Sequence, residues 1–494
     1  MTTYGRTSLV LALSAAAVAA TLTVAPGATA SASALPGGLS WKPCGPAGLG
    51  QECATLSVPQ DYAKPAGPQL SLAVSRIRSE RPEARRGTLV VIPGGPGSSG
   101  VQRLSQKGAA LGAELGGAYD LVAFDPRGVG GSSTANCGLD PEDRRMVTLR
   151  SWPAADGSID ENVARSRRTA EACLANGGER LRSFTTANQA RDLDRFRQAL
   201  GEEKLSAWGV SYGTYVGAVY ATKYPHRTDR WVLDSSADPN PERVARGWLA
   251  DMAKGAEDRF PDFAKWAADP ARAELRLAEH PSDVRPLILD LATRLDHEPK
   301  ESTTPGVPLT GNILRQALQN ALYSDTAFAS FAELVRSAQD PKSIPVLPAQ
   351  SSAAMPDSDA ALSVAVICND VKWPRSVRAH ERAVAVDRAR HPLTAGMPVN
   401  MTPCSFWKSP AEKPTRITDR GPSNILMIQS LRDPSTPYTS GLKMREALGA
   451  RVRLVTVGQG GHGMYLGNGN ACGNAAVTTF LTAGERPAGD VYCG

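Results

Sequence analysis

The sequence has 494 residues, and 55 Lys and Arg against 49 Asp and Glu give it a net charge of +6. This length allows one large domain with an insertion, or two domains. Charges of both signs are interspersed without a basic block or an aromatic–basic stripe, which argues against nucleic acid as the main partner.

Residues 1–34 have the pattern of a signal peptide. Arg6 precedes an apolar, Ala-rich run over residues 9–24, and residues 28–30 (Ala-Thr-Ala) offer a small-residue cleavage site. Residues 32–34 (Ala-Ser-Ala) offer a second site, so the start of the mature chain stays open, with or without a short propeptide. A membrane anchor is the alternative, but the apolar run is short and interrupted by hydroxyl side chains. We therefore predict a secreted, extracellular protein without a stable membrane anchor.

The eight cysteines support export, because an even number in an exported chain indicates disulfides. Closing a short loop costs less than closing a long one, which favours pairs of sequence neighbours. The predicted pairs are Cys44 with Cys53, Cys137 with Cys173, Cys368 with Cys404, and Cys472 with Cys493. A zinc site is the rival interpretation, but there is no C-x-x-C pair and no histidine at ligand spacing from a cysteine. We expect no metal and no other cofactor.

Apolar runs that end abruptly in Gly, Pro or Asp predict the strands of a core sheet. Residues 69–74 alternate polar and apolar side chains and predict an antiparallel edge strand. Further strands are predicted over residues 89–92, 121–124, 205–208, 231–233, 425–428 and 454–457. Helical patterns lie between them, including residues 189–200, with Asn188 as N-cap, and residues 215–223. Strands that alternate with helices indicate an α/β fold with a mostly parallel central sheet, covered on both faces.

Residues 239–420 break this alternation. They are rich in Ala, Arg, Asp and Pro, with helical patterns such as 313–322 and 328–338 and no strand that runs into glycine. We interpret the stretch as a mainly helical cap, or lid, inserted between core strands. The predicted organisation is a first part of the core over residues 35–238, the cap over 239–420, and the C-terminal part of the core over 421–494.

The pentapeptide Gly209-Val210-Ser211-Tyr212-Gly213 follows one of the predicted strands. Gly-x-Ser-x-Gly at a strand end is typical of a nucleophile elbow, whose tight turn needs small residues beside an exposed serine. Such a match can also arise by chance, in which case Ser211 is a loop serine between glycines. A nucleophile requires a base, an acid that orients the base, and an oxyanion hole, so these partners decide between the two interpretations.

The sequence offers candidates for both the base and the acid. Of the six histidines, only His462 follows a predicted core strand and lies between glycines, so we predict it as the base. Asp433 ends the strand before it and gives the chain order Ser, Asp, His that elbow enzymes use. Asp234 is the second candidate for the acid. Thr436 lies near enough in sequence to form a hydrogen bond with Asp433.

The oxyanion hole requires two backbone N–H donors. Tyr212, the residue after the serine, is predicted to supply one. The second is expected from the Gly-rich loop over residues 94–97, where missing side chains let the backbone approach a substrate. Gly95 is the first choice and Gly94 the second.

Together these motifs resemble the α/β-hydrolase peptidases related to proline iminopeptidase. The motifs are residues 93–97 (Pro-Gly-Gly-Pro-Gly), 125–132 (Asp-Pro-Arg-Gly-Val-Gly-Gly-Ser) and 209–214 (Gly-Val-Ser-Tyr-Gly-Thr). More closely, nearly the whole mature chain resembles the secreted tripeptidyl aminopeptidases of Gram-positive bacteria. That resemblance rests on residues 41–44 (Trp-Lys-Pro-Cys), 52–54 (Glu-Cys-Ala), 58–62 (Val-Pro-Gln-Asp-Tyr), 368–370 (Cys-Asn-Asp) and 433–437 (Asp-Pro-Ser-Thr-Pro). Pro93 stands where the iminopeptidases usually carry histidine, which favours the tripeptidyl branch.

The resemblance implies an α/β-hydrolase fold and a serine exopeptidase that forms an acyl-enzyme. Its substrates would be peptides or proteins with a free N-terminus, from which it releases short N-terminal pieces such as tripeptides. Their ammonium group requires an anionic site in the cap. The candidates are Asp370, Glu257, Asp258 and Asp262.

Three alternatives stay open beside this interpretation. A secreted carboxylesterase or lipase can use the same triad, because fold and triad do not fix the acyl group. Release of single residues, as in proline iminopeptidases, needs only a shorter site. A binding protein on an inactive hydrolase scaffold is the third, and it predicts that Ser211 does not react with a fluorophosphonate.

Overall fold

The computed structural model describes residues 38–494, of which Leu39–Gly494 form one compact unit. The predicted signal peptide, residues 1–34, lies outside the described residues. None of the helices in the described range combines the length and the apolar character that crossing a bilayer requires.

A ten-stranded sheet organises the described residues, in the order β1-β2-β3-β5-β4-β6-β7-β8-β9-β10. The strands are β1 (Lys42–Pro43), β2 (Gln51–Pro59), β3 (Gln69–Ile77), β4 (Gly87–Ile92), β5 (Tyr119–Phe124), β6 (Leu205–Val210), β7 (Thr228–Asp234), β8 (Ile425–Arg432), β9 (Val452–Gly460) and β10 (Val491–Cys493). The pairs from β1 to β3, and β3 with β5, are antiparallel, and every later pair is parallel. The predicted strands all form.

The strand predicted at the edge lies inside the sheet. It is β3, which has β2 on one side and β5 on the other. The prediction was wrong about its position because residues 42–59 supply two further strands that the sequence analysis did not find. Its alternation of exposed and buried residues is nevertheless real, since only one of its faces is covered over the first residues.

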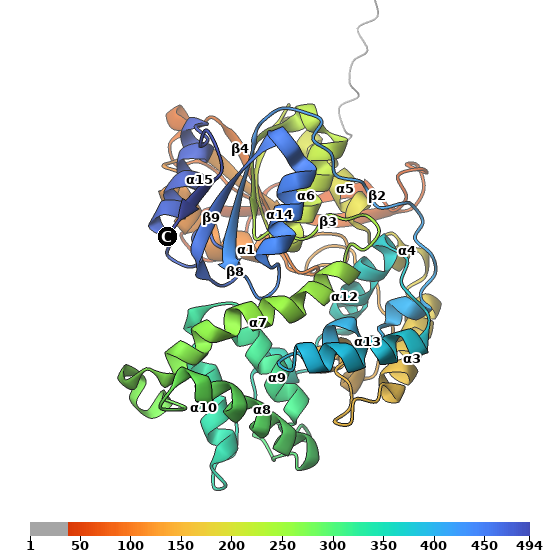
Figure 1. Ribbon diagram of the computed structural model, residues 1–494. Coiled ribbons are helices and arrows are strands. Elements are labelled where there is room, and N and C mark those ends of the chain that lie inside the picture. Colours follow the sequence, from red (N-terminus) through yellow and green to blue (C-terminus); the bar gives the residue numbers. More distant parts are fainter. Residues whose placement is uncertain (1–37) are drawn as a thin grey trace, which may run out of the picture. The chain divides into compact units, whose positions relative to one another are not determined.

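Five helices cover the two faces of the sheet (Figure 1). They are α1 (Gly100–Glu114), α5 (Thr186–Ala199), α6 (Tyr212–Lys223), α14 (Tyr438–Leu448) and α15 (Ala471–Ala483). Leu89 and Val91 of β4 pack in one core with α1 and α15, whereas Val90 and Ile92 pack in another with α5, α6 and α14. This alternation along one apolar strand is what a parallel sheet covered on both faces requires.

Helix α5 begins earlier than the sequence pattern suggested. Its N-cap is Thr185, whose side chain accepts a hydrogen bond from the Asn188 backbone N–H at 3.1 Å. The predicted cap, Asn188, therefore lies in the first turn. Both residues are good capping types, and the pattern could not decide between them.

The residues between β7 and β8 form helices and loops, with no strand that joins the sheet. The helices are α7 (Arg246–Ala268), α8 (Pro281–His297), α9 (Gly311–Ala321), α10 (Phe328–Gln339), α11 (Ala349–Ser352), α12 (Asp357–Asp370) and α13 (Val377–Arg390). Part of this insertion has an apolar core of its own, with Phe263, Leu291 and Leu318 among its buried residues. We refer to this insertion, predicted over residues 239–420, as the cap.

A second, shorter insertion joins the cap. It follows β5 and contains α2 (Met146–Leu149), α3 (Asp160–Asn176) and α4 (Gly178–Arg182). The backbone N–H groups of Cys137, Gly138 and Leu139 all donate to Asp357 at the start of α12, each at 2.8 Å. From the sequence this segment is predicted as part of the core, because it lies between two core strands. Its helical patterns do not indicate which neighbours the helices contact.

The four predicted disulfides are confirmed, and they use all eight cysteines. Cys368–Cys404 joins the C-terminal part of α12 to the turn over residues 403–406. Cys137–Cys173 ties the second insertion to itself at its junction with α12. These two disulfides therefore restrain the second insertion and α12.

Candidate active site

Ser211 occupies a strained turn between β6 and α6. Its backbone angles are φ 58° and ψ −126°, a region that non-glycine residues rarely adopt. The Ser211 N–H donates to the carbonyl of Asp234 on the neighbouring strand at 2.9 Å, and its own carbonyl accepts from the Thr214 N–H at 2.8 Å. The surrounding sheet and helix thus hold the serine in the conformation of a nucleophile elbow.

The two glycines of the pentapeptide are required by close backbone contacts. A Cβ atom on Gly209 would lie 2.7 Å from the carbonyl oxygen of Gly213. A Cβ atom on Gly213 would overlap the carbonyl oxygen of Ile92 and lie 2.7 Å from that of Pro93. Both contacts are with backbone atoms, which cannot rotate away as a flexible side chain can.

Gly213→Ala should therefore destabilise the protein strongly. We expect the free energy of unfolding to fall by roughly 3 kcal/mol, because the added methyl group forces β4 and α6 apart. Chemical denaturation with activity as a second readout measures the effect. Gly112→Ala in α1 is the matched control, since a Cβ there meets no atom within 4 Å, and alanine should stabilise the helix by up to about 1 kcal/mol. Equal stabilities of the two variants would contradict the close contact between Gly213 and the carbonyl groups of Ile92 and Pro93.

Asp433 and His462 form a buried pair beyond the ends of β8 and β9. The His462 Nδ1 lies 2.9 Å from Asp433 Oδ2 and 3.0 Å from Oδ1. Asp433 also accepts hydrogen bonds from the backbone N–H groups of Ser435 and Thr436, both at 2.8 Å, and from the Thr436 hydroxyl at 3.0 Å. The predicted contact between Thr436 and the acid is thereby confirmed, and the carboxylate is fixed by donors on several sides.

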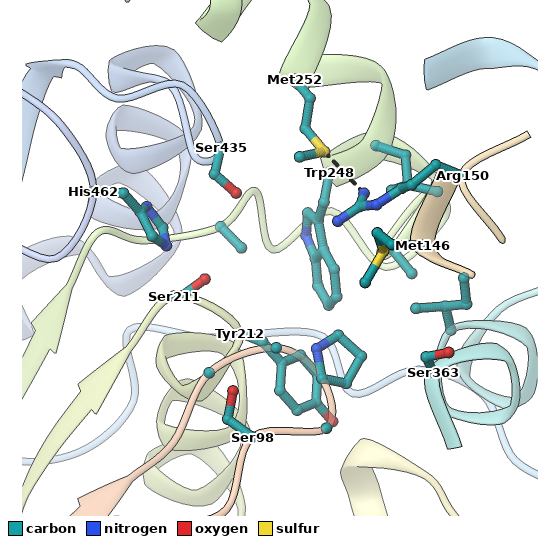
Figure 2. A pocket seen from close by; sticks show the side chains of 18 of the residues that line it. Ser98, Met146, Arg150, Ser211, Tyr212, Trp248, Met252, Ser363, Ser435 and His462 are labelled. Carbon is teal, nitrogen blue, oxygen red and sulfur yellow. Dashed lines mark hydrogen bonds between the residues drawn. The ribbon is translucent and has the colours of Figure 1, made fainter. Parts of the chain in front are cut away.

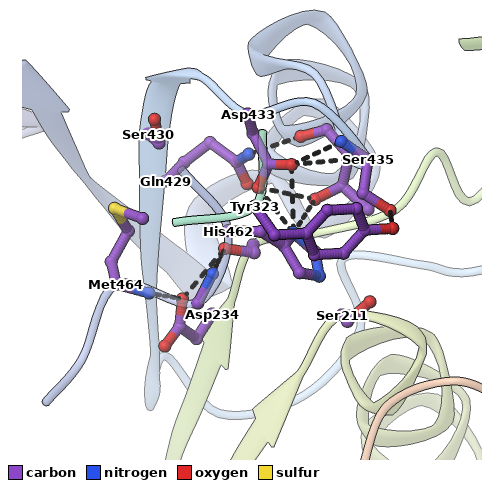
Figure 3. A network of polar contacts seen from close by, with 12 residues as sticks. Ser211, Asp234, Tyr323, Gln429, Ser430, Asp433, Ser435, His462 and Met464 are labelled. Atoms are coloured by element: carbon purple, nitrogen blue, oxygen red, sulfur yellow. Dashed lines mark hydrogen bonds and ion pairs between the residues drawn. The ribbon is translucent and has the colours of Figure 1, made fainter. Parts of the chain in front are cut away.

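The His462 ring lies between Asp433 and Ser211 (Figure 3). Its Nδ1 faces the carboxylate, and in residues 38–494 its Nε2 has no protein hydrogen-bond partner, the Ser211 hydroxyl included. Hydrogen bonds of this kind are often long in the absence of substrate and shorten when one binds. The free nitrogen is therefore available to a reacting group above Ser211.

The surroundings of His462 favour its protonated form. Burial lowers the pKa of the imidazole, but the charge and the hydrogen bond of Asp433, with a smaller contribution from Asp234, outweigh burial and raise the pKa above its ordinary value. A ring of this kind is a stronger base than a free histidine. A general base must be neutral to accept a proton, so His462 acts above its own pKa.

Asp234, the second candidate for the acid, contacts the backbone that follows His462 and not its ring. Its fully buried carboxylate accepts from the backbone N–H groups of Met464 at 2.8 Å and Tyr465 at 2.9 Å, and from Trp208 Nε1 at 3.3 Å. The neighbouring Ser235 hydroxyl accepts from the Gly463 N–H at 2.9 Å. Asp234 and Ser235 thus anchor the histidine loop to the end of β7.

The predicted oxyanion donors, Tyr212, Gly95 and Gly94, lie around Ser211 and line the cavity. The Tyr212 N–H belongs to the first turn of α6, where helix N–H groups have no partner within the helix. A Cβ atom on Gly94 would lie 3.6 Å from the Ser211 hydroxyl oxygen, so this glycine passes directly beside the serine. Gly95 follows with φ 109° and lines the same cavity. Gly94 thus lies beside the hydroxyl, and Gly95 lines the same cavity.

The Asp-Pro-Arg-Gly motif, residues 125–128, contacts the start of α1, which directly follows the Gly-rich loop. Asp125 accepts from the Ser99 hydroxyl at 2.6 Å and from the Val101 N–H at 3.0 Å, at the start of α1. Arg127 forms a buried ion pair with Asp192 of α5, with N–O distances of 2.6 and 2.7 Å. Asp125 therefore holds the junction between the Gly-rich loop and α1, and no residue of the motif lines the cavity.

Ser211 and His462 open into a cavity of about 710 Å³ (Figure 2). Apolar side chains dominate the region away from His462, among them Met146 and Leu149 of α2 and Trp248 and Met252 of α7. Three cations also line it: Arg103, Lys107 and Arg150. The volume lies in the range typical of small-ligand sites, so the cavity accommodates a short peptide segment.

The four cap acids predicted to bind a substrate ammonium do not line this cavity, which corrects the expectation. Asp370 is buried, accepts from Thr186, and has its pKa raised to about 6 by burial. The other three pair with cations outside the cavity. These pairs are Glu257 with Arg285, Asp258 with Lys254, and Asp262 with Arg259 and Arg432.

Asp359 is the carboxylate that the sequence analysis missed. Among the described residues that line the cavity it is the one acidic side chain, and it is exposed in the first turn of α12. Its sequence context, two acids ahead of an apolar run, is the ordinary start of a helix. No signal in the sequence distinguishes it from its neighbour Asp357, which binds backbone N–H groups instead.

The cap also contacts His462 directly through Tyr323, which follows α9. The Tyr323 carbonyl accepts from the His462 N–H at 2.9 Å, and the two rings meet edge to face with centroids 5.0 Å apart. The Tyr323 hydroxyl donates to the Ser435 hydroxyl at 3.0 Å, next to Asp433. The sequence offered no means of finding this contact, since it depends on how the insertion folds back.

A mostly parallel sheet covered on both faces, an elbow serine after β6, and an Asp–His pair after β8 and β9 define a serine hydrolase of the α/β-hydrolase fold. In residues 38–494 there is no group of three or more His, Cys, Asp or Glu side chains placed to hold a metal ion.

Comparison with known proteins identifies the family. The chain is 34% identical over 491 residues to the tripeptidyl aminopeptidase of Streptomyces lividans, covering 94% of this chain and 88% of the relative. It is 31% identical over 476 residues to carboxylesterase B of Mycobacterium tuberculosis, covering 89% and 86%. It is 28% identical over 488 residues to the serine protease Hip1 of the same species, covering 92% and 91%. A family model described as TAP-like protein matches residues 392–493. The chain belongs to the family of the tripeptidyl aminopeptidases.

Proposed function

We propose that this protein is an exported serine exopeptidase that releases short N-terminal peptides, such as tripeptides, from substrates with a free N-terminus. Ser211 is the nucleophile, His462 the general base, and Asp433 the acid that orients it. The observation that carries the proposal is the Asp433–His462 pair above the elbow serine, inside a cavity bounded by both the core and the cap. The relationship to a protein named tripeptidyl aminopeptidase supports the substrate class.

The reaction follows from the positions of these groups. The Ser211 Oγ attacks the scissile carbonyl carbon while His462 Nε2 takes its proton, and the Tyr212 N–H with that of Gly95 or Gly94 stabilises the negative oxygen. The protonated imidazole then gives this proton to the departing amine, which leaves an ester on Ser211. Water, deprotonated by the same histidine, attacks the ester, and the histidine returns this proton to the Ser211 Oγ as the N-terminal peptide leaves.

Asp359 is the proposed partner of the substrate ammonium. It lies at the cavity, it is exposed, and within the described part of the chain it forms no ion pair. Because an ammonium held there fixes the start of the peptide, its separation from Ser211 would determine how many residues lie before the scissile bond.

Asp359→Asn should raise KM for a free-amine peptide anilide by about tenfold or more, since a charge-assisted hydrogen bond contributes roughly 1.5–3 kcal/mol. Turnover of a short acyl ester, which has no ammonium, should change little. Asp258→Asn is the matched control, because that cap acid pairs with Lys254 outside the cavity. An equal loss on the anilide and the ester would contradict the role of Asp359.

Three substrates test the function itself: a tripeptide anilide with a free amine, its N-blocked form, and a short acyl ester. We expect rapid cleavage of the first, little of the second, and product analysis that identifies intact tripeptides from longer peptides. A carboxylesterase, the activity for which one relative is named, would instead prefer the ester and ignore the state of the amine. Undiminished cleavage of the blocked peptide would rule out the aminopeptidase proposal.

Export is part of the proposal. Four disulfides are typical of proteins that fold in oxidising compartments, and the signal pattern over residues 1–34 agrees with them. Expression of the full chain in a bacterial host with intact secretion should yield a protein in the medium that lacks these residues, as intact-mass analysis would detect.

A further inference from the structure

Two cations reach the cavity from α1 without an acidic partner. Arg103 and Lys107 lie one helical turn apart, so their side chains share one face of the helix. Neither side chain forms an ion pair with any residue in the range 38–494, although many other arginines of this protein do. The Arg103 Nε is buried and has no hydrogen-bond partner, although its guanidinium carbon lies 5.2 Å from the centroid of the Trp208 ring.

A guanidinium whose Nε is buried without a hydrogen-bond partner destabilises the protein unless another group binds it. Removing charge from water requires compensation by hydrogen bonds or by an opposite charge. Stacking on Trp208 supplies part of this, but it leaves the buried Nε–H of Arg103 without a hydrogen-bond acceptor. Since the side chain lines the cavity, an anionic group of a bound substrate is the partner that fits.

The location of these cations indicates which part of the substrate they would contact. Lys107 Nζ donates to the carbonyl of Leu466, four residues after His462, at 3.2 Å. Trp208, on which Arg103 stacks, packs edge to face against Tyr465, three residues after His462, with ring centroids 5.5 Å apart. His462 must hand its proton to the departing amine, so the leaving fragment lies on this side of Ser211.

We propose that Arg103, with Lys107 beside it, binds a carboxylate of the leaving fragment. This inference rests on the proposed function, because it assumes a peptide acylating Ser211. Two sources supply the same chemistry: the C-terminal carboxylate of a leaving fragment one residue long, or an acidic side chain at the first position after the scissile bond. Either would form charge-assisted hydrogen bonds with the planar guanidinium.

The third cation of the cavity provides a control within the same site. Arg150 lies away from Ser211, beside Met146 (Figure 2), and its Nη1 is 3.2 Å from the Met252 sulfur. Replacing Arg150 by Gln lowers the net charge of the cavity lining by one unit, as replacing Arg103 by Gln does. A carboxylate effect specific to the leaving side should respond to Arg103 and not to Arg150.

The experiment compares kcat/KM for matched peptides. One pair is a tetrapeptide with a free C-terminal carboxylate and its C-terminal amide, both cleaved to the same tripeptide. A second pair consists of amidated pentapeptides with Glu or Gln after the scissile bond. A tripeptide anilide, whose leaving group is neutral, reports turnover without the carboxylate. Rates are taken on the alkaline plateau of each variant, because changing Arg103 also shifts the pKa of His462.

We expect the wild-type protein to prefer the free carboxylate in at least one pair by about tenfold. Arg103→Gln should reduce that ratio to near one and leave anilide turnover largely intact, while Arg103→Lys should retain part of the preference and Arg150→Gln all of it. Preference in the first pair alone identifies the C-terminal carboxylate as the source, and preference in the second pair identifies a side chain.

Two results would overturn the proposal. One is a wild-type protein without a preference in either pair, and the other is an unchanged ratio in Arg103→Gln. Failure of the proposed function looks different, since then the free-amine anilide and both tetrapeptides would resist cleavage altogether. Retained anilide turnover in Arg103→Gln also shows that the variant has folded.

Discussion

Ser211→Ala should reduce kcat on a tripeptide anilide by roughly a million-fold, the loss typical of removing a triad nucleophile. Without the hydroxyl no acyl-enzyme can form, and the imidazole of His462 has no proton to take. The methyl group fits the same turn, since Ser211 contributes no side-chain hydrogen bond to the elbow. Thermal unfolding should therefore occur near the wild-type temperature, and labelling by a fluorophosphonate should disappear.

Ser363→Ala is the matched control for that experiment. Its hydroxyl lies in the same cavity but donates only to the Ala360 carbonyl of its own helix. This variant should keep both labelling and turnover. Labelling that persists in Ser211→Ala would locate the reactive serine elsewhere and refute the assignment of the elbow.

Asp433→Asn should lower kcat/KM by roughly 10⁴-fold and also shift the pH profile. The base must be neutral, so activity is lost as pH falls through the pKa of His462. Burial opposes protonation, but Asp433 raises this pKa above the ordinary value of about 6.5. The acid limb of wild-type kcat/KM should accordingly lie above that value. Asparagine removes the charge, so the residual activity should show its acid limb at lower pH.

The comparison variant is Asp234→Asn, which alters the second buried carboxylate near the same ring. Asp234 holds the loop through backbone N–H groups, so we expect a smaller loss of kcat and a smaller shift of the acid limb. A larger effect from Asp234 than from Asp433 would reverse the assignment of the acid.

The sequence predicted the elements whose constraints are local. Gly209 and Gly213 flank the serine because backbone atoms approach them, and that requirement is visible in five residues. His462 and Asp433 follow apolar strands whose carboxyl ends meet at one edge of a parallel sheet, so chain order was enough to find them. The disulfides likewise join sequence neighbours, where the cost of loop closure guides the pairing.

Other features depend on tertiary contacts that no local pattern records. Glu257 pairs with Arg285 of α8 and Asp370 with Thr186 of α5, whereas Asp359 lines the cavity. The second insertion after β5 contacts α12 through Asp357, more than two hundred residues later in the chain. In both cases the side-chain types are ordinary, and only the packing of the helices determines their partners.

The contact between Tyr323 and His462 means that the cap is not a detachable module. The Tyr323 carbonyl accepts from the His462 backbone N–H, and the Tyr323 ring packs against the imidazole, so a chimera that exchanges the whole insertion between relatives also replaces a support of the base. Engineering of substrate choice by grafting would therefore succeed best with junctions that retain α9 and Tyr323.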